Sequence, residues 1–209
     1  MKTFFTPLFP LALAFLAGCS DVEDDHDHDH DHDHEHEVIT TVELTFTPTN
    51  GGEDLVFTWA DPEDDGNPVI DDIVLQSATT DYQLSIAFLN ELEEPFEDVT
   101  EEIAMEADEH QVFLTGTGVE GPATGTNDDA LISHLYADSD DDGLPVGLLN
   151  DIRTLKTGTG ELELALRHLP YENNAPVKTE GMAEDVASGG LGAIAGANDV
   201  SVTFNIEVE

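Results

Sequence analysis

The chain of 209 residues carries 47 acidic side chains against five Lys and Arg, which gives a formal net charge of −42 at pH 7. A surface this acidic repels nucleic acid and anionic lipid headgroups, which excludes both as partners of the surface, and it attracts cations. The length suits one domain of ordinary size with appendages, and a single Cys excludes a scaffold built on internal disulfides.

Residues 1–18 have the features of a signal peptide. Lys2 supplies the positive start, and residues 4–15 form an apolar run that is too short to span a membrane. The run ends in Leu16-Ala17-Gly18-Cys19, which resembles the lipobox of bacterial lipoproteins, where cleavage precedes the Cys and its thiol carries a diacylglycerol. Cys19 is therefore the expected lipidation site, and its acyl chains would provide the membrane anchor.

The residues after Cys19 indicate the membrane to which the protein is sent. Ser20 stands where an Asp would resemble an inner-membrane retention signal, and residues 21–25 (DVEDD) resemble the acidic export signal of surface lipoproteins in some Gram-negative bacteria. We expect the outer membrane, with the domain exposed at the cell surface. An orientation towards the periplasm is the alternative.

Residues 19–37 form an Asp/His-rich tail that is expected to be disordered, because it has high charge and almost nothing to bury. Its stretch DDHDHDHDHDHEHE places imidazoles on one edge of an extended chain and carboxylates on the other. Imidazole with carboxylate suits zinc, nickel or copper, and binding should weaken as pH falls. The six candidate ligands are His26, His28, His30, His32, His34 and His36. A solvated spacer between membrane and domain is the alternative interpretation.

From Val38 onward, apolar and polar residues alternate with the period of β-strands. The predicted strands cover residues 38–47, 54–59, 70–76, 82–88, 111–115, 131–136, 147–155, 161–167 and 200–208. About eight or nine strands bounded by turn residues predict an all-β fold, an antiparallel immunoglobulin-like β-sandwich over residues 38–209. One short crossover helix is expected at residues 98–103, and residues 171–199 are predicted to be a long loop.

Several segments of the domain resemble a group of small bacterial lipoproteins. The matching stretches are VITT (38–41), IDDI (70–73), FLNE (88–91), DVTEE (98–102), DEHQ (108–111), LRH (166–168) and DVSVTF (199–204). The resemblance covers nearly all of residues 38–209. Members of that group of lipoproteins are often labelled with the type 1 periplasmic binding fold. That fold needs two α/β lobes of repeated βαβ units, whereas the pattern here predicts strands. The resemblance implies no particular activity.

Two acidic loops match the start of calcium-binding loops: residues 138–143 (DSDDDG) and residues 61–66 (DPEDDG). Carboxylates at the first, third and fifth positions converge when Gly permits a sharp turn, and calcium takes six to eight oxygen ligands. The candidate ligands are Asp138, Asp140 and Asp142 in one loop, and Asp61, Glu63 and Asp65, with Asp72 at the twelfth position, in the other. Leu149 stands at the twelfth position of the former loop, which departs from the pattern. Ordinary hairpin turns are the alternative.

Three histidines lie within the domain. His110 starts a predicted strand, while His134 and His168 share the parity of apolar neighbours. Hydrogen-bonded structural roles are favoured, and a three-His zinc site is the alternative, because sequence positions do not show whether the three meet. The sequence contains no G-x-S-x-G, HExxH or P-loop motif, so no enzymatic activity is predicted.

Two hypotheses follow for function. The first is a non-catalytic, lipid-anchored surface protein that binds divalent cations, with a zinc-type metal on the tail and calcium in the acidic loops. The second is a structural or adhesive surface module whose tail is only a spacer.

Overall fold

The computed structural model describes residues 37–76 and 80–209. The predicted signal peptide, the lipidation site Cys19 and the six tail histidines lie outside these residues. Within the described part, no helix is both long enough and apolar enough to cross a membrane.

Strands dominate the described chain. The strands are β1 (Thr41–Pro48), β2 (Leu55–Ala60), β3 (Val69–Ile70), β4 (Ile73–Leu75), β5 (Asp81–Asn90), β6 (Glu97–Asp98), β7 (His110–Thr115), β8 (Val119–Glu120), β9 (Ile132–Tyr136), β10 (Leu149–Thr154), β11 (Gly158–His168) and β12 (Ala197–Val208). The helices are α1 (Val99–Met105) and α2 (Met182–Gly189), with 3-10 turns at Ala107–Glu109 and Leu191–Ala193.

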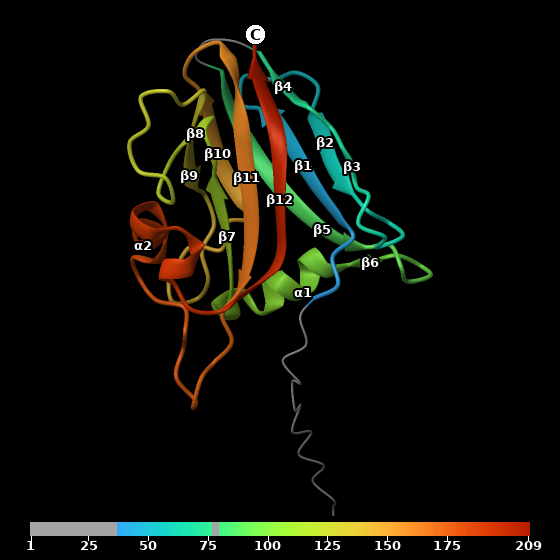
Figure 1. Ribbon diagram of the computed structural model, residues 1–209, viewed down its shortest axis with the longest axis vertical. Helices are drawn as coiled ribbons and strands as arrows, with labels where there is room; N and C mark the ends of the chain where they lie inside the picture. The colour runs from blue at the N-terminus through green and yellow to red at the C-terminus, as the bar shows by residue number, and fades with distance from the viewer. Residues whose placement is uncertain (1–36, 77–79) are drawn as a thin grey trace, which may run out of the picture. The chain divides into compact units, whose positions relative to one another are not determined.

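The strands form two sheets. The larger has the order β3-β2-β1-β5-β10-β9-β8, with β6 paired to β5, and the smaller has the order β4-β12-β11-β7. In Figure 1 the smaller sheet lies in front of the larger one, α2 flanks one side, and α1 lies at the end where β7 begins. The mostly-β, two-sheet expectation is confirmed.

The narrower expectation, a purely antiparallel immunoglobulin-like sandwich, is not confirmed. Strand β4 runs parallel to β12, and β8 runs parallel to β9, so both sheets are mixed. A second helix, α2, also occupies part of the segment that was predicted to be a long loop. Strand β4 lies within the predicted strand at residues 70–76, but a sequence pattern does not give the direction in which a strand pairs. Strand β8 has only two residues, which carry too little periodicity to be recognised in a sequence.

The core follows the period-two patterns. In β12 the residues at positions 200, 202, 204, 206 and 208 are buried, and their neighbours at 201, 203, 205 and 207 are exposed. Strand β1 buries Val42, Leu44 and Phe46 in the same way. The ring of Phe46 meets Phe57 and Tyr82 edge to face, at centroid distances of 6.0 and 6.1 Å. The two sheets therefore share one apolar core between their facing sides.

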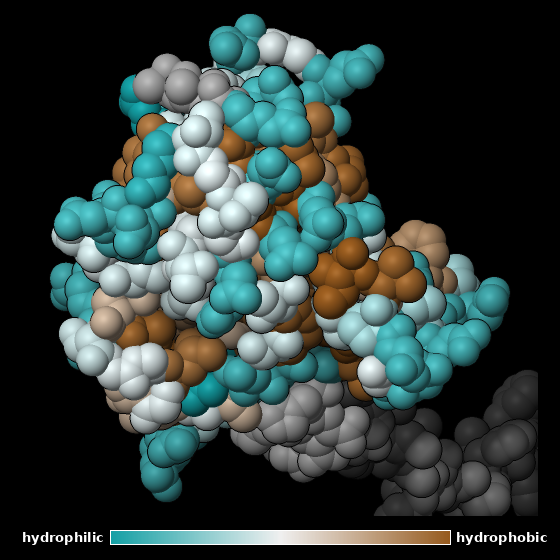
Figure 2. All heavy atoms as spheres, turned by 45° about the horizontal axis from the view of Figure 1, so that its top comes forward, coloured by the Kyte–Doolittle hydropathy of each residue, from teal (hydrophilic) through white to brown (hydrophobic). Residues whose placement is uncertain are grey.

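Both helices are short and amphipathic. Helix α1 begins where Asp98 accepts a hydrogen bond from the Thr100 amide, as its N-cap sequence predicts, and it buries Val99 and Ile103. Helix α2 packs Met182 and Val186 into a smaller apolar cluster. Outside this packing the surface is largely polar: Figure 2 shows hydrophilic residues over much of one face, with apolar patches between them.

Candidate metal centre

Four side chains from distant parts of the chain converge at one end of the smaller sheet. Glu37 precedes β1, His110 opens β7, His168 ends β11, and Asp199 lies near the start of β12. One ligand atom from each lies within 4.8 Å of all the others. Ligand atoms from three or more His, Cys, Asp or Glu side chains converge at this cluster alone within the described ranges.

The two histidines meet because their strands are neighbours. His110 and His168 are register partners in the antiparallel β7–β11 ladder. His110 lies on the same side of β7 as the buried Val112, and His168 lies on the same side of β11 as the buried Leu166. Their rings stack with centroids 4.7 Å apart and an interplanar angle of 14°.

Asp199 reaches the cluster through a β-bulge. In the β11–β12 ladder Leu166 pairs with Val200, but the next residue, Arg167, pairs with Asn198. Asp199 is the extra residue, and such a residue is turned away from the direction that strict alternation would give it. Its side chain is consequently fully buried, although its neighbour Val200 also faces inward.

The distances suit a metal ion of ordinary size. His110 Nε2 lies 2.9 Å from Glu37 Oε1 and 3.9 Å from Asp199 Oδ2. His168 Nδ1 lies 4.0 Å from Glu37 Oε2 and 3.9 Å from Asp199 Oδ1. Neighbouring ligand atoms of a tetrahedral zinc ion, each about 2.0 Å from it, are roughly 3.3 Å apart. Shifts of less than about 1 Å would therefore complete such a site.

Contacts behind the two rings orient them. His110 Nδ1 lies 3.0 Å from the carbonyl oxygen of Glu106. Because a carbonyl oxygen only accepts, Nδ1 carries the hydrogen and Nε2 is the nitrogen that faces the carboxylates. On the other ring, His168 Nε2 faces the Glu109 carboxylate at 3.9 Å, so Nδ1 is turned to the cluster. Metal-binding histidines commonly have this second partner on the ring nitrogen that does not bind the metal.

Without a metal, a proton takes the place of the cation. Burial tends to raise the pKa of Glu37, but the hydrogen bond and charge of His110 outweigh it and lower this pKa to about 2. Burial tends to lower the pKa of His110, but Glu37 and, more weakly, Asp199 raise it above its usual value. Glu37 Oε2 is buried and has no hydrogen-bond partner among the described residues. The carboxylates of the cluster thus favour a positive charge between them.

The third histidine, His134, lies elsewhere, so a three-His site does not form. Its Nε2 lies 2.8 Å from Asn150 Oδ1, and the Asn150 amide donates to the Gly147 carbonyl at 2.7 Å. Burial lowers the pKa of His134 to about 4, although the Asn150 contact tends to raise it, so His134 is neutral at pH 7. His134 has the structural, hydrogen-bonded role that the sequence favoured.

We expect His134 to make the fold sensitive to acid. The unfolded chain binds a proton near pH 6.5, whereas folded His134 resists protonation until about pH 4. Neutral His134 therefore leaves the fold fully stable above pH 6.5, and up to about 3 kcal/mol of the free energy of unfolding is lost as pH falls towards 4. Urea unfolding of the wild type and of His134→Gln at pH 7 and pH 4.5 measures it. The variant should lose less stability between the two pH values, and equal losses contradict the assignment.

The acidic loops use their carboxylates internally. In residues 138–143, Asp138 accepts hydrogen bonds from the Gly147 and Leu149 amides at 2.7 and 2.9 Å. Asp140 accepts from two amides of its own loop, and its Oδ2 lies 2.8 Å from Lys178 Nζ. Asp142 is exposed. The cation beside this loop is therefore a lysine ammonium.

The second acidic loop is a hydrogen-bonded turn. Asp61 accepts from the amides of Asp65 and Gly66 at 3.1 and 2.8 Å. Asp72 instead accepts from the Asn205 side chain on β12, at 2.8 Å, and Glu63 is exposed. Calcium in either loop remains a prediction from the sequence.

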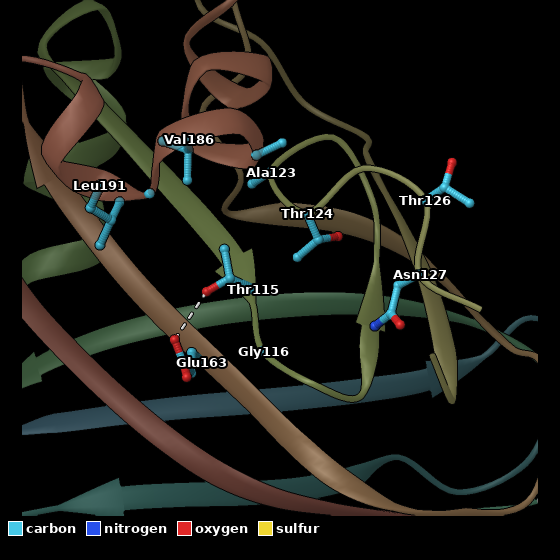
Figure 3. Close-up of a pocket in the computed structure, with 11 residues that line it drawn as sticks. Thr115, Gly116, Ala123, Thr124, Thr126, Asn127, Glu163, Val186 and Leu191 are labelled. Atoms are coloured by element: carbon cyan, nitrogen blue, oxygen red, sulfur yellow. Dashed lines mark hydrogen bonds between the residues drawn. The ribbon is translucent and has the colours of Figure 1, made fainter. Parts of the chain in front are cut away.

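A pocket of about 530 Å³ lies beside α2, apart from the cluster residues. Thr115, Thr124 and Asn127 face it together with Val186 and Leu191 (Figure 3). Thr115 donates to the Glu163 carboxylate at 3.3 Å across the β7–β11 pair. None of the four cluster residues lines this pocket.

No protein-family model, curated protein or solved structure matches this chain.

Proposed function

We propose that this protein binds a divalent transition metal ion through Glu37, His110, His168 and Asp199, as a non-catalytic, lipid-anchored protein of the cell surface. The observation that carries the proposal is the convergence of two oriented imidazoles and two carboxylates in a buried site. Buried carboxylates are costly unless positive charge compensates them, and a metal ion held by the two imidazoles would supply such charge.

The ligand set favours a transition metal over calcium. Imidazole suits zinc, copper, iron and nickel, whereas calcium takes six to eight oxygens. The two carboxylates supply two negative charges, which a divalent cation neutralises. The four side chains are 0–7% exposed, and four protein ligands complete a tetrahedral shell. A closed shell suits holding an ion better than activating a substrate.

The tail and the anchor complete the proposal from the sequence. Lipidation of Cys19 would place the domain at a membrane surface, and the His/Asp alternation would bind the same class of metal.

Zinc is expected to stabilise the fold through the domain site. An ion that binds the folded state at 100 times its Kd adds about 2.7 kcal/mol. Tail ligands remain available after unfolding, so tail binding should add little to this shift. The measurement is thermal unfolding of the full chain with and without zinc, beside a full chain whose six tail histidines are Gln. Equal shifts in both support the domain site, whereas a shift that disappears with the tail histidines contradicts it.

The stabilisation should grow with pH. Without metal, protonated His110 stabilises the fold below pH 6.5, and this stabilisation is lost as pH rises through its raised pKa. Ionised Glu37 stabilises the fold above pH 4.5, and this stabilisation is lost as pH falls towards 2. Metal binding requires His110 to be deprotonated, so protons compete at low pH. The zinc-induced shift should therefore be larger at pH 8 than at pH 6, and the reverse order contradicts the site.

A further inference from the structure

We propose that the metal centre also accepts divalent ions that require six ligands, such as Mn²⁺ and Fe²⁺, by binding them through both oxygens of each carboxylate. The inference deepens the proposed function and rests on it, because it requires that the four side chains bind an ion. A tetrahedral zinc ion uses one oxygen from each carboxylate, which leaves two further oxygens for an ion with a larger shell.

Each carboxylate of the cluster faces the two imidazoles with two different oxygens. Glu37 places Oε1 2.9 Å from His110 Nε2 and Oε2 4.0 Å from His168 Nδ1. Asp199 places Oδ2 3.9 Å from His110 Nε2 and Oδ1 3.9 Å from His168 Nδ1. An ion that lies between the two imidazole nitrogens therefore meets both oxygens of each carboxylate, and the centre offers it two nitrogens and four oxygens.

The spread of the distances between these donors suits a six-ligand shell. In a tetrahedral zinc shell all ligand atoms are about 3.3 Å apart. An octahedral shell with ligands about 2.1 Å from the ion has adjacent donors about 3.0 Å apart and opposite donors about 4.2 Å apart. The four nitrogen–oxygen distances at the centre range from 2.9 to 4.0 Å, so they approach both octahedral values.

The burial of the second oxygen of Glu37 supports this way of binding. Glu37 Oε2 is buried and has no hydrogen-bond partner among the described residues. An ion that bound only Oε1 would leave Oε2 without a partner, which is costly for a buried polar atom. Binding through both oxygens compensates the whole carboxylate.

The charge of the site favours one ion over two. The same oxygens could bridge a pair of ions, each held by one imidazole and one oxygen of each carboxylate. Two divalent ions would bring four positive charges against the two negative charges of the carboxylates. The excess would lie among side chains that are 0–7% exposed, where an uncompensated charge is costly. A single divalent ion balances the two carboxylates.

The first test counts the ligands of bound Mn²⁺. It uses the full chain with the six tail histidines replaced by Gln, and the same chain with His110→Gln and His168→Gln as the background for subtraction. Electron paramagnetic resonance of the free ion gives the number of Mn²⁺ ions bound, and X-ray absorption of the bound ion gives its coordination number. We expect one Mn²⁺ per chain, with six nitrogen and oxygen ligands, that depends on His110 and His168.

The second test is the substitution Glu37→Gln in the same background. A carboxamide keeps one acceptor oxygen and replaces the other with an NH₂ group that only donates, so Mn²⁺ loses a ligand that zinc does not use. We expect the affinity for Mn²⁺ to fall at least about tenfold more than the affinity for zinc. Asp151→Asn, an exposed carboxylate on β10, is the control and should change neither affinity.

The outcomes separate the inference from the proposed function. Four ligands around Mn²⁺, two ions per chain, equal losses of the two affinities in Glu37→Gln, or binding of zinc without binding of Mn²⁺ would each overturn the inference and leave the centre intact. If neither zinc nor Mn²⁺ binds in a way that depends on His110 and His168, the proposed function fails, and the inference fails with it.

Discussion

Replacing His110 or His168 with Gln is expected to weaken zinc binding at the centre by at least about 100-fold. Loss of a partner that only orients a metal-binding side chain typically costs roughly 10- to 100-fold, so loss of the ligand itself should cost at least as much. The measurement is competition against a chelator, in the full chain with the six tail histidines replaced by Gln. In that background only three histidines remain, so tail binding does not obscure the result.

His134→Gln is the matched control for this substitution. It is also a buried histidine on a strand, but it bonds to Asn150 and contributes nothing to the cluster. Its zinc affinity should equal that of the parent chain. Glu109→Gln should have an intermediate effect, because Glu109 only faces the outer nitrogen of His168. Equal losses for His110→Gln and His134→Gln would show that the effect comes from general destabilisation, and the assignment of the centre would then be wrong.

The sequence predicts the β-strands well because their signal is local. Strands β1, β5, β11 and β12 are eight to twelve residues long and bury alternate residues over much of their length, so each carries its own periodicity. Helix α2 was missed for the opposite reason. It has eight residues, and two glycines with positive φ, Gly181 and Gly190, flank it, so the segment looks like a loop. Its helicity depends on packing Met182 and Val186 against the domain.

The metal centre shows which features of a site remain hidden. The parity and strand-end positions of His110 and His168 are visible in the sequence, and pairing β7 with β11 would have brought them together. Asp199 gives no such signal, because strict alternation with Val200 predicts a solvent-facing carboxylate until the bulge turns it inward. Glu37 is hidden differently, as one more acidic residue at the end of a highly acidic tail. Residue type suggests chemistry, but long-range pairing decides which residues share a site.

Lys178 is another buried residue whose partner the sequence does not reveal. Its replacement is expected to lower the free energy of unfolding more than the other substitutions proposed for this protein. The residue is 2% exposed, its Nζ lies 2.8 Å from Asp140 Oδ2, and it donates to the Ala107 carbonyl at 2.7 Å. Burial lowers the pKa of Lys178, and the adjacent Asp140 counteracts that effect. Lys178→Met removes the ammonium and leaves the Asp140 carboxylate buried without its counter-ion. Breaking a buried pair from one side typically costs about 3–5 kcal/mol.

Urea unfolding of three variants measures this. Lys178→Met should lose about 3–5 kcal/mol, and Lys178→Met with Asp140→Asn should recover a large part, since the second change removes the uncompensated charge. Asp151→Asn, an exposed carboxylate on β10, is the control and should change stability by less than about 0.5 kcal/mol. A loss below about 1 kcal/mol for Lys178→Met, or no recovery in the double variant, contradicts the assigned role.

The same variants test the calcium hypothesis for residues 138–143. In the wild type the ammonium of Lys178 already neutralises Asp140, and backbone amides hold Asp138, so calcium has to compete with contacts that the fold provides. Removing Lys178 frees the Asp140 carboxylate beside the exposed Asp142. We therefore expect millimolar calcium to stabilise Lys178→Met more than the wild type, because a divalent cation can take the place of the ammonium. Equal calcium effects on the two proteins would contradict this competition between Lys178 and calcium. If calcium stabilises neither protein, the loop is a hydrogen-bonded turn that takes no part in calcium binding.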